Sequence, residues 1–182
     1  MSKKVGMISL GCPKNQVDAE IMLSKLQKGG FEIVNDPMDA DVVIVNTCGF
    51  IGDAKEESIN MILELCNLKE EGELNRVYVM GCLSERYLEE LGQEIPQVDK
   101  FYGKFNWTEL LHDLGETYNP ELRNHRVLTT PPHHAYIKIS EGCNRFCSYC
   151  AIPLITGRHQ SRPMEAIVEE VRYLVDKGVK EF

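Results

Sequence analysis

The stretch Asp41-Val-Val-Ile-Val-Asn46 decides the fold class, because four consecutive β-branched apolar residues lie between two polar ones. A strand that is apolar on both faces is buried on both faces, as in a parallel sheet covered by helices. Further apolar runs occur at Val5 to Leu10 and at Arg76 to Met80. Helical patterns separate these runs, at Asp18 to Lys28 and Ala54 to Leu68. The alternation predicts an α/β domain with an open parallel sheet.

Weaker patterns extend this domain to about residue 115. They predict two strands and two helices, at Phe31–Val34, Glu85–Leu91, Val98–Tyr102 and Trp107–Leu114 in chain order. Residues 116–135 are polar, contain three prolines and show no hydrophobic period, so we interpret them as a linker. The sequence therefore predicts a first domain over residues 1–115.

The pattern starts again after the linker, over residues 136–182. It predicts a strand at Tyr136–Ile139, a long loop, an amphipathic helix at Pro163–Lys177 and the opening of another strand at Val179–Phe182. This is the first strand-loop-helix unit of a repeating β/α architecture. A closed (β/α) barrel takes about 200 residues or more. We therefore expect an incomplete barrel, the alternative being that the unit packs on the first domain and ends there.

Charge and cysteine content narrow the function classes. The 182 residues carry a net charge of −8, and a protein that binds nucleic acid usually presents a basic face. No direct nucleic-acid binding is therefore expected of this portion. The apolar run near Met1 is too short for a signal peptide or a membrane span, which predicts a cytoplasmic protein with no membrane partner. In a reducing compartment the seven cysteines are expected to be ligands or core residues.

Cys143, Cys147 and Cys150 have the spacing C-x-x-x-C-x-x-C between a predicted strand and a predicted helix. Three thiolates bind a common centre if the loop wraps around it. Three protein ligands on a four-iron cluster leave one iron open to a small molecule, whereas a structural zinc needs four ligands. His159 is the one nearby candidate for a fourth ligand. The spacing favours an iron–sulfur cluster, with zinc or unliganded cysteines as the alternatives.

Cys12, Cys48 and Cys82 form a second candidate set. Each follows an apolar strand run and lies beside a glycine. Ligands of open parallel sheets bind beyond the carboxyl ends of the strands, so the pattern suggests one shared site. Buried cysteines also occur as small core residues, and the pattern alone leaves that alternative open. Cys66 lies on the apolar stripe of its helix, and we predict that it is a core residue.

Residues 141–153, Glu-Gly-Cys-Asn-Arg-Phe-Cys-Ser-Tyr-Cys-Ala-Ile-Pro, resemble the signature of the radical S-adenosylmethionine (SAM) superfamily. The resemblance implies that Cys143, Cys147 and Cys150 hold a 4Fe–4S cluster whose open iron binds SAM. Reductive cleavage of SAM then gives a deoxyadenosyl radical. The resemblance also implies that Tyr149 lies near the adenine of SAM; a packing aromatic is the alternative.

Three further strings resemble the amino-terminal domain of the radical SAM methylthiotransferases. They are Gly11-Cys-Pro-Lys-Asn15, Asn46-Thr-Cys-Gly-Phe-Ile51 and Gly81-Cys-Leu-Ser-Glu-Arg86. The resemblance implies a flavodoxin-like domain in which the cysteines of these strings, Cys12, Cys48 and Cys82, hold an auxiliary 4Fe–4S cluster. It therefore implies two 4Fe–4S clusters and SAM as cofactors, and a methylthio group installed at an unreactive C–H bond.

The string around Cys12 also points to a branch of the family. It differs from the Gly-Cys-Gln-Met-Asn that is typical of the tRNA-modifying branch and is similar to the branch called RimO. That resemblance implies methylthiolation of the β-carbon of an aspartate in a small-subunit ribosomal protein, with an external electron donor. A tRNA adenosine methylthiotransferase and a non-catalytic iron–sulfur-binding fragment are the alternatives. Most of the barrel and the family's small carboxyl-terminal β domain are missing, so activity of this chain alone is not implied.

Overall fold

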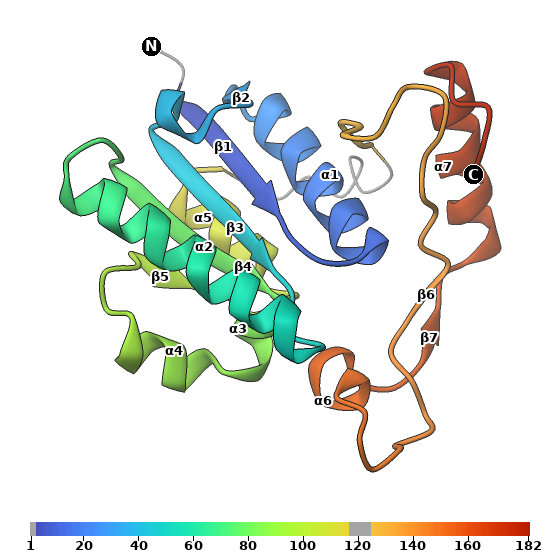
Figure 1. The fold of residues 1–182 in the computed structure, drawn as a ribbon. Coiled ribbons are helices and arrows are strands. Elements are labelled where there is room, and N and C mark those ends of the chain that lie inside the picture. Colours follow the sequence, from blue (N-terminus) through green and yellow to red (C-terminus); the bar gives the residue numbers. More distant parts are fainter. Residues whose placement is uncertain (1–2, 117–124) are drawn as a thin grey trace.

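The computed structural model describes residues 3–116 and 125–182. A five-stranded parallel sheet forms the centre of the first of these segments (Figure 1). Its strands are β1 (Lys4–Ser9), β2 (Glu32–Val34), β3 (Val42–Thr47), β4 (Arg76–Gly81) and β5 (Lys100–Phe101). They lie side by side in the order β2-β1-β3-β4-β5, and every pairing is parallel. This is the strand order of flavodoxin-like sheets, so the predicted α/β fold class is confirmed.

Helices cover both faces of the sheet. They are α1 (Pro13–Lys28), a short 3-10 helix η1 (Pro37–Asp39), α2 (Gly52–Glu70), α3 (Cys82–Arg86), α4 (Leu88–Glu94) and α5 (Trp107–Asp113). The alternation along β3 explains the two layers, because Val43 and Val45 pack toward α2 and α4, whereas Val42 and Ile44 pack toward α1 and α5. All six residues of β3 are buried, as its continuous apolar pattern predicts.

In this part of the chain one predicted helix differs from the structure, and one predicted core residue is confirmed. The helix predicted at Glu85–Leu91 is two short helices, α3 and α4, because the backbone leaves helical geometry at Tyr87, with φ −131° and ψ 36°. Cys66 is 3% exposed and packs in the core between α2 and the sheet. Its predicted role as a core residue is therefore confirmed.

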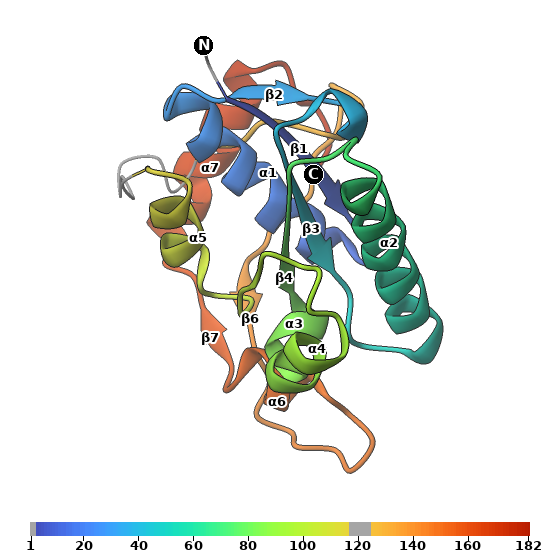
Figure 2. The ribbon, with the colours of Figure 1, turned by 90° about the vertical axis from the view of Figure 1, so that its left-hand side faces the viewer.

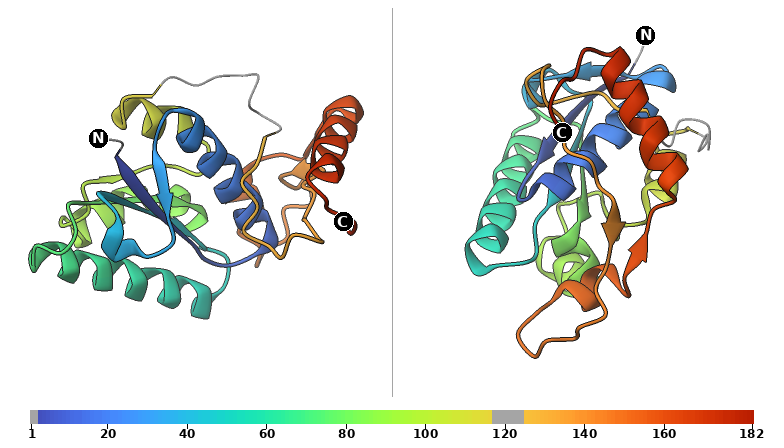
Figure 3. Two further views of the ribbon diagram at one scale, coloured as in Figure 1. Left: turned by 90° about the horizontal axis from the view of Figure 1, so that it is seen from above. Right: turned by 90° about the vertical axis from the view of Figure 1, so that its right-hand side faces the viewer.

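The second described segment forms a small unit beside α1. Its elements are β6 (Ser140–Glu141), α6 (Ile152–Thr156), β7 (Gln160–Ser161) and α7 (Met164–Asp176). Strands β6 and β7 pair in an antiparallel way and close the base of a loop that extends beyond the rest of the chain (Figure 2). Helix α1 lies between the sheet and α7 (Figure 3). Leu174 of α7 is fully buried against Ala135 and Val179, which form a separate small core.

The strand predicted at Tyr136–Ile139 is wrong as a sheet strand. Side chains bond two of its carbonyls, because Arg126 donates to the Tyr136 carbonyl and Arg162 to the Lys138 carbonyl, while the backbone N–H of Arg162 donates to the Ile139 carbonyl at 2.9 Å. A parallel β-bridge joins His134, which lies two residues before the predicted strand, to Glu181. This bridge connects the two ends of a β/α unit that includes α7. Glu181 lies within the strand opening predicted at Val179–Phe182.

The linker predicted at residues 116–135 lies partly outside the described residues, since residues 117–124 are not described. Its later part packs on the first domain, where the Val127 N–H donates to the Glu20 carbonyl of α1. Across the described residues no helix is both long and apolar enough to cross a membrane.

Candidate metal centre

Cys12, Cys48 and Cys82 line one cavity of about 520 Å³. The cavity lies at the carboxyl ends of β1, β3 and β4, which are neighbours in the sheet. Cys12 follows β1 and precedes α1, Cys48 follows β3, and Cys82 is the first residue of α3. The strand order thus brings together three cysteines that are 36 and 34 residues apart in the chain.

Glycines beside these cysteines let the strand ends approach closely. Gly11 has a φ of +90°, and a Cβ there would lie 2.5 Å from the Cβ and 2.8 Å from the Sγ of Cys48. A Cβ on Gly49 would lie 2.7 Å from the carbonyl oxygen of Cys82. All three distances are shorter than the contact distance of a carbon atom. A larger residue at Gly11 or Gly49 would therefore push two of the cysteines apart.

The side chain of Asn15 hydrogen-bonds at the carboxyl ends of all three strands. Its side chain is buried, and Nδ2 donates to the carbonyl oxygens of Leu10 at 3.1 Å and Thr47 at 2.7 Å. Its Oδ1 accepts from the thiol of Cys82 at 3.4 Å. One amide therefore links the segments that follow β1 and β3 to the cysteine that follows β4.

The remaining walls of the cavity are mostly apolar. Phe50, Ile51 and Ala54 form one side, at the start of α2. Ile152 and Ile155 of α6 form the other side, and α6 lies against α3. Because α6 follows Cys150 directly, the second cysteine motif and the wall of the first site belong to one continuous segment. Within this lining Cys48 is buried and Cys82 is partly exposed, whereas Cys12 is exposed to solvent.

Charged residues gather at one rim of the cavity. Burial raises the pKa of the Cys82 thiol, and Cys48, Cys12 and Asp18 act in the same direction, while Lys104 opposes them. Burial lowers the pKa of Lys104, but the negative groups around it, led by Asp18, outweigh burial and raise it on balance. The thiol of Cys82 is therefore protonated near neutral pH without a metal. A metal would favour the thiolate.

The second motif lies on the loop between β6 and α6. The Cys143 N–H donates to the Gly157 carbonyl at 3.1 Å, and the Cys150 N–H to the Cys147 carbonyl at 3.0 Å. Phe146 has a φ of +44°, which turns the chain between the first two cysteines. Cys147 is exposed, and Cys143 and Cys150 are partly exposed. The loop thus presents its cysteines to solvent, outside the cavity that holds the first three.

Neither set is arranged around a single ion. Among the described residues, no three His, Cys, Asp or Glu side chains lie close enough to hold one metal ion. A zinc site would need four ligands at about 2.0–2.3 Å from one centre. An iron–sulfur cluster binds each cysteine at a different iron, so its ligands stay farther apart around a larger space.

Tyr149 is 90% exposed on the loop. Its predicted position near the adenine of SAM stays a prediction, and so does the alternative of a packing aromatic. His159 is also exposed, and its Nε2 lies 3.2 Å from the Ser161 hydroxyl on β7.

Two family models match this chain, and each covers one of the two sets of cysteines. Residues 4–103, which carry the first three cysteines, match the family model described as uncharacterized protein family UPF0004. The chain belongs to the UPF0004 family. Residues 137–182, which carry the second motif and α7, match the model of the radical SAM superfamily.

Three curated relatives of this UPF0004 protein bear the name "Ribosomal protein uS12 methylthiotransferase RimO". The protein from Bacteroides thetaiotaomicron is 63% identical over 182 residues, which are 99% of this chain and 42% of the relative. Those from Porphyromonas gingivalis and Aquifex aeolicus are 56% and 54% identical, over 98% of this chain and 42% and 40% of their own lengths. The resemblance to the radical SAM methylthiotransferases, and among them to the RimO branch, is confirmed. The chain spans about two fifths of the length of these relatives.

Several residues of the UPF0004 site escaped sequence reasoning. Asn15 and Glu141 lie within the quoted motifs, but their spacing indicated no role for either side chain. No sequence pattern indicated a role for Lys104. It follows a weak strand pattern, and only the folded structure brings its side chain to Cys82. The α6 residues Ile152 and Ile155 were part of a predicted loop, and nothing in their spacing indicated that they would cover the first site.

Proposed function

We propose that this chain is part of an enzyme that adds a methylthio group to the β-carbon of an aspartate in a small-subunit ribosomal protein. The enzyme would act in the cytoplasm with two 4Fe–4S clusters, SAM and an external electron donor. One observation carries the proposal: Cys12, Cys48 and Cys82 converge on a cavity whose far wall, Ile152 and Ile155, directly follows the second cysteine motif. The names of the relatives agree with it.

The first cavity fits a group that binds soft ligands. Its lining offers three cysteine sulfurs and, as the one other metal-binding side chain, Glu141, whose carboxylate is already paired with lysines. Thiolates in apolar surroundings suit an iron–sulfur cluster better than a hard, oxygen-binding ion. We infer that Cys12, Cys48 and Cys82 are the ligands of an auxiliary 4Fe–4S cluster.

The second loop fits a cluster that must remain accessible to a small molecule. Pairing of β6 with β7 holds the two ends of the loop together, and the Arg145 N–H donates to the Sγ of Cys143 at 3.5 Å. We infer that Cys143, Cys147 and Cys150 hold the SAM-binding cluster and that Tyr149 lies near the adenine. When bound, the two clusters and SAM would supply the sulfur, the methyl group and the hydrogen-abstracting radical.

The chain's own residues have two tasks in this scheme. Asn15 and Lys104 fix the position of Cys82, and the apolar residues of α2 and α6 exclude water from the first site.

We further propose that residues 1–115 are the auxiliary-cluster domain, 116–135 a linker and 136–182 the start of the radical SAM domain. The two family matches, over 4–103 and 137–182, support that division.

Iron and acid-labile sulfide per chain test the cluster assignment. After anaerobic reconstitution we expect about eight irons, and about four in either triple variant, Cys12→Ala/Cys48→Ala/Cys82→Ala or Cys143→Ala/Cys147→Ala/Cys150→Ala. About four irons in the unsubstituted chain, lost only in the first variant, would mean that residues 136–182 alone do not hold their cluster. Iron that is unaffected by either variant would refute both ligand sets.

Two assays test the reaction itself. A protein extended to the full length of its relatives should form deoxyadenosine from SAM under reduction and add one methylthio group to a small-subunit ribosomal protein, detected by mass spectrometry. Modification of tRNA in its place would favour the tRNA branch. If the 182-residue chain binds iron but releases no deoxyadenosine, it is a non-catalytic iron–sulfur-binding fragment by itself.

A further inference from the structure

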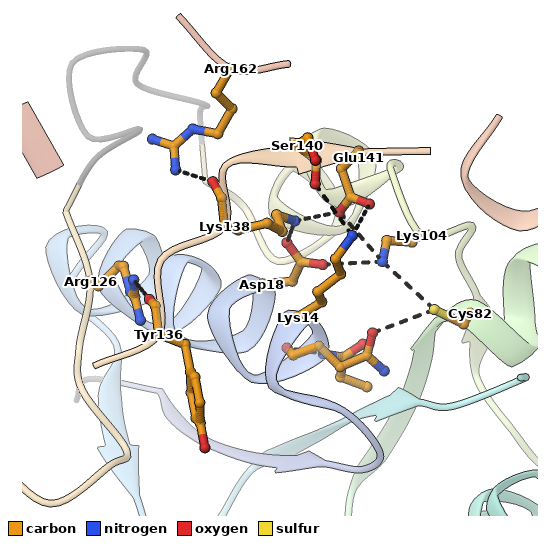
Figure 4. A network of polar contacts seen from close by, with 12 residues as sticks. Lys14, Asp18, Cys82, Lys104, Arg126, Tyr136, Lys138, Ser140, Glu141 and Arg162 are labelled. Atoms are coloured by element: carbon orange, nitrogen blue, oxygen red, sulfur yellow. Dashed lines mark hydrogen bonds and ion pairs between the residues drawn. The ribbon is translucent and has the colours of Figure 1, made fainter. Parts of the chain in front are cut away.

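Lys104 is a buried cation that contacts both cysteine-bearing parts of the chain. Its side chain is 4% exposed. Its Nζ donates to the Sγ of Cys82 at 3.7 Å and lies 3.4 Å from Oδ2 of Asp18 and 3.7 Å from Oε1 of Glu141 (Figure 4). Glu141 lies in β6, two residues before Cys143. One ammonium group therefore joins a cysteine of the first site to the base of the loop that carries the second.

Further charged groups surround Lys104. Lys138 pairs with both Asp18 and Glu141, and Lys14 lies 3.9 Å from Glu141. A third carboxylate, that of Glu85, accepts from the backbone N–H of Lys104 at 2.7 Å. Lys104 is the lysine of this group that reaches a cysteine sulfur. Since it is buried, its field is weakly screened by water.

We propose that Lys104 is a positioning residue that couples the two cysteine sites: it raises the reduction potential of the cluster held by Cys12, Cys48 and Cys82, and through Glu141 it fixes the base of the Cys143 loop. The inference rests on the proposed function, which supplies that cluster. A nearby positive charge and a hydrogen bond to a ligand sulfur both stabilise the more negative, reduced form of a cluster.

The coupling has a consequence for the arrangement of the sites. Glu141 is held by Lys104 and Lys138, and both lysines also bind Asp18 of α1. Loss of Lys104 would leave the carboxylate of Glu141 with less compensating charge at the edge of a mostly apolar cavity. The base of the loop would then no longer be held in position relative to the first site. The same would be true of α6, which begins two residues after Cys150.

A redox titration tests the first half of the proposal. The full chain carrying Cys143→Ala/Cys147→Ala/Cys150→Ala is reconstituted, so that only the first cluster contributes, and its midpoint potential is followed by electron paramagnetic resonance. Lys104→Met should shift the potential to a more negative value, and Lys104→Arg should stay close to the parent chain. Lys100→Met is the matched control, because Lys100 is a half-exposed lysine paired with Glu109 and Asp113, away from the cysteines.

The outcomes separate this inference from the proposed function. Equal potentials for Lys104→Met and the parent chain, or an equal shift in Lys100→Met, overturn the role of Lys104. A parent chain whose iron does not depend on Cys12, Cys48 and Cys82 instead overturns the proposed function. If Lys104→Met loses its iron, the same titration of Lys104→Gln decides with the same two outcomes.

Hydrogen exchange tests the second half. In the chain with its natural cysteines, Lys104→Met should speed amide exchange at Cys143, whose N–H is bonded to Gly157 at the base of the loop. Lys104→Arg and Lys100→Met should leave that exchange rate unchanged. Unchanged exchange in Lys104→Met would overturn the link from Lys104 to the loop.

Discussion

Arg126 and Glu20 form a salt bridge in which both side chains are completely buried. Nε and Nη2 of Arg126 donate to the same carboxylate oxygen of Glu20 in α1, and Nη1 donates to Glu170 of α7 at 2.7 Å. Thr129 satisfies the other oxygen of Glu20 through its N–H and its hydroxyl. A single guanidinium thus connects the flavodoxin-like domain with the helix of the second unit.

Substitution of Arg126 by Met should destabilise the protein by about 3–5 kcal/mol, because buried Glu20 loses its compensating charge and buried Glu170 is left with its ion pair to Arg162. Urea unfolding measures the change. Lys69→Met is the control: Lys69 pairs with Asp99 at 2.6 Å, but both side chains are about one quarter exposed. We expect a loss of no more than about 1 kcal/mol for that control. A similar small loss for Arg126→Met would show that the buried network contributes little.

The hydrogen bonds of Asp113 should make stability depend on pH. Lys100 and Tyr102 donate to its carboxylate at 2.6 and 2.8 Å and lower the pKa of Asp113. A group with a lowered folded-state pKa stabilises the fold above its ordinary pKa, about 4, and loses that effect as the pH falls through the lower folded value. Asp113→Asn should therefore be less stable than the parent at neutral pH, and the difference should shrink below about pH 4.

Urea unfolding of both proteins at neutral and acid pH measures that difference. Asp176→Asn is the control, because the Asp176 side chain makes no hydrogen bond or ion pair with any described residue. The control should not lose stability at neutral pH, because a carboxylate in the last turn of α7 faces the negative end of the helix dipole. A loss for Asp113→Asn that is the same at neutral and acid pH would contradict the assignment.

Cys66 provides a test of which cysteines bind iron. It is buried in the core of α2, and burial, the largest influence, raises the pKa of its thiol. Cys66→Ala should cost about 1 kcal/mol of stability through lost packing and leave the iron content unchanged. Cys82→Ala should instead lower the iron content. Loss of iron in Cys66→Ala with the fold intact, measured by circular dichroism and iron analysis, would give Cys66 a role that the structure does not suggest.

The fold was predictable where the sequence pattern has one physical solution. Val42 to Val45 are apolar on both faces of their strand, and only a sheet covered on both sides buries them. The strand predicted at Tyr136–Ile139 failed, because apolar residues in a short run do not provide a partner strand. There the side chains of Arg126 and Arg162 bond the carbonyls of Tyr136 and Lys138, and the backbone N–H of Arg162 bonds that of Ile139.

The site was predictable only in part, for a related reason. Cys12, Cys48 and Cys82 follow strands that are neighbours in the sheet, and topology alone brings them to one edge. The contact of Lys104 with Cys82 depends on how the segment after β5 folds back toward α3. The cover provided by Ile155 depends on how residues 125–182 pack on the sheet and its helices, and no local pattern encodes either arrangement.

Gly11 offers the sharpest test of the first site. Gly11→Ala should both strain the backbone, since φ is +90°, and place a methyl group against Cys48. Gly30 is the matched control: it has the same φ of +90°, but a Cβ there meets no atom within 4 Å. Both variants should lose about 1–2 kcal/mol of stability from the left-handed backbone. Only Gly11→Ala should also lose iron from the chain that carries Cys143→Ala/Cys147→Ala/Cys150→Ala. If Gly30→Ala loses as much iron, general destabilisation explains the loss, and if neither does, Cys12 and Cys48 need not lie as close as they do in order to bind it.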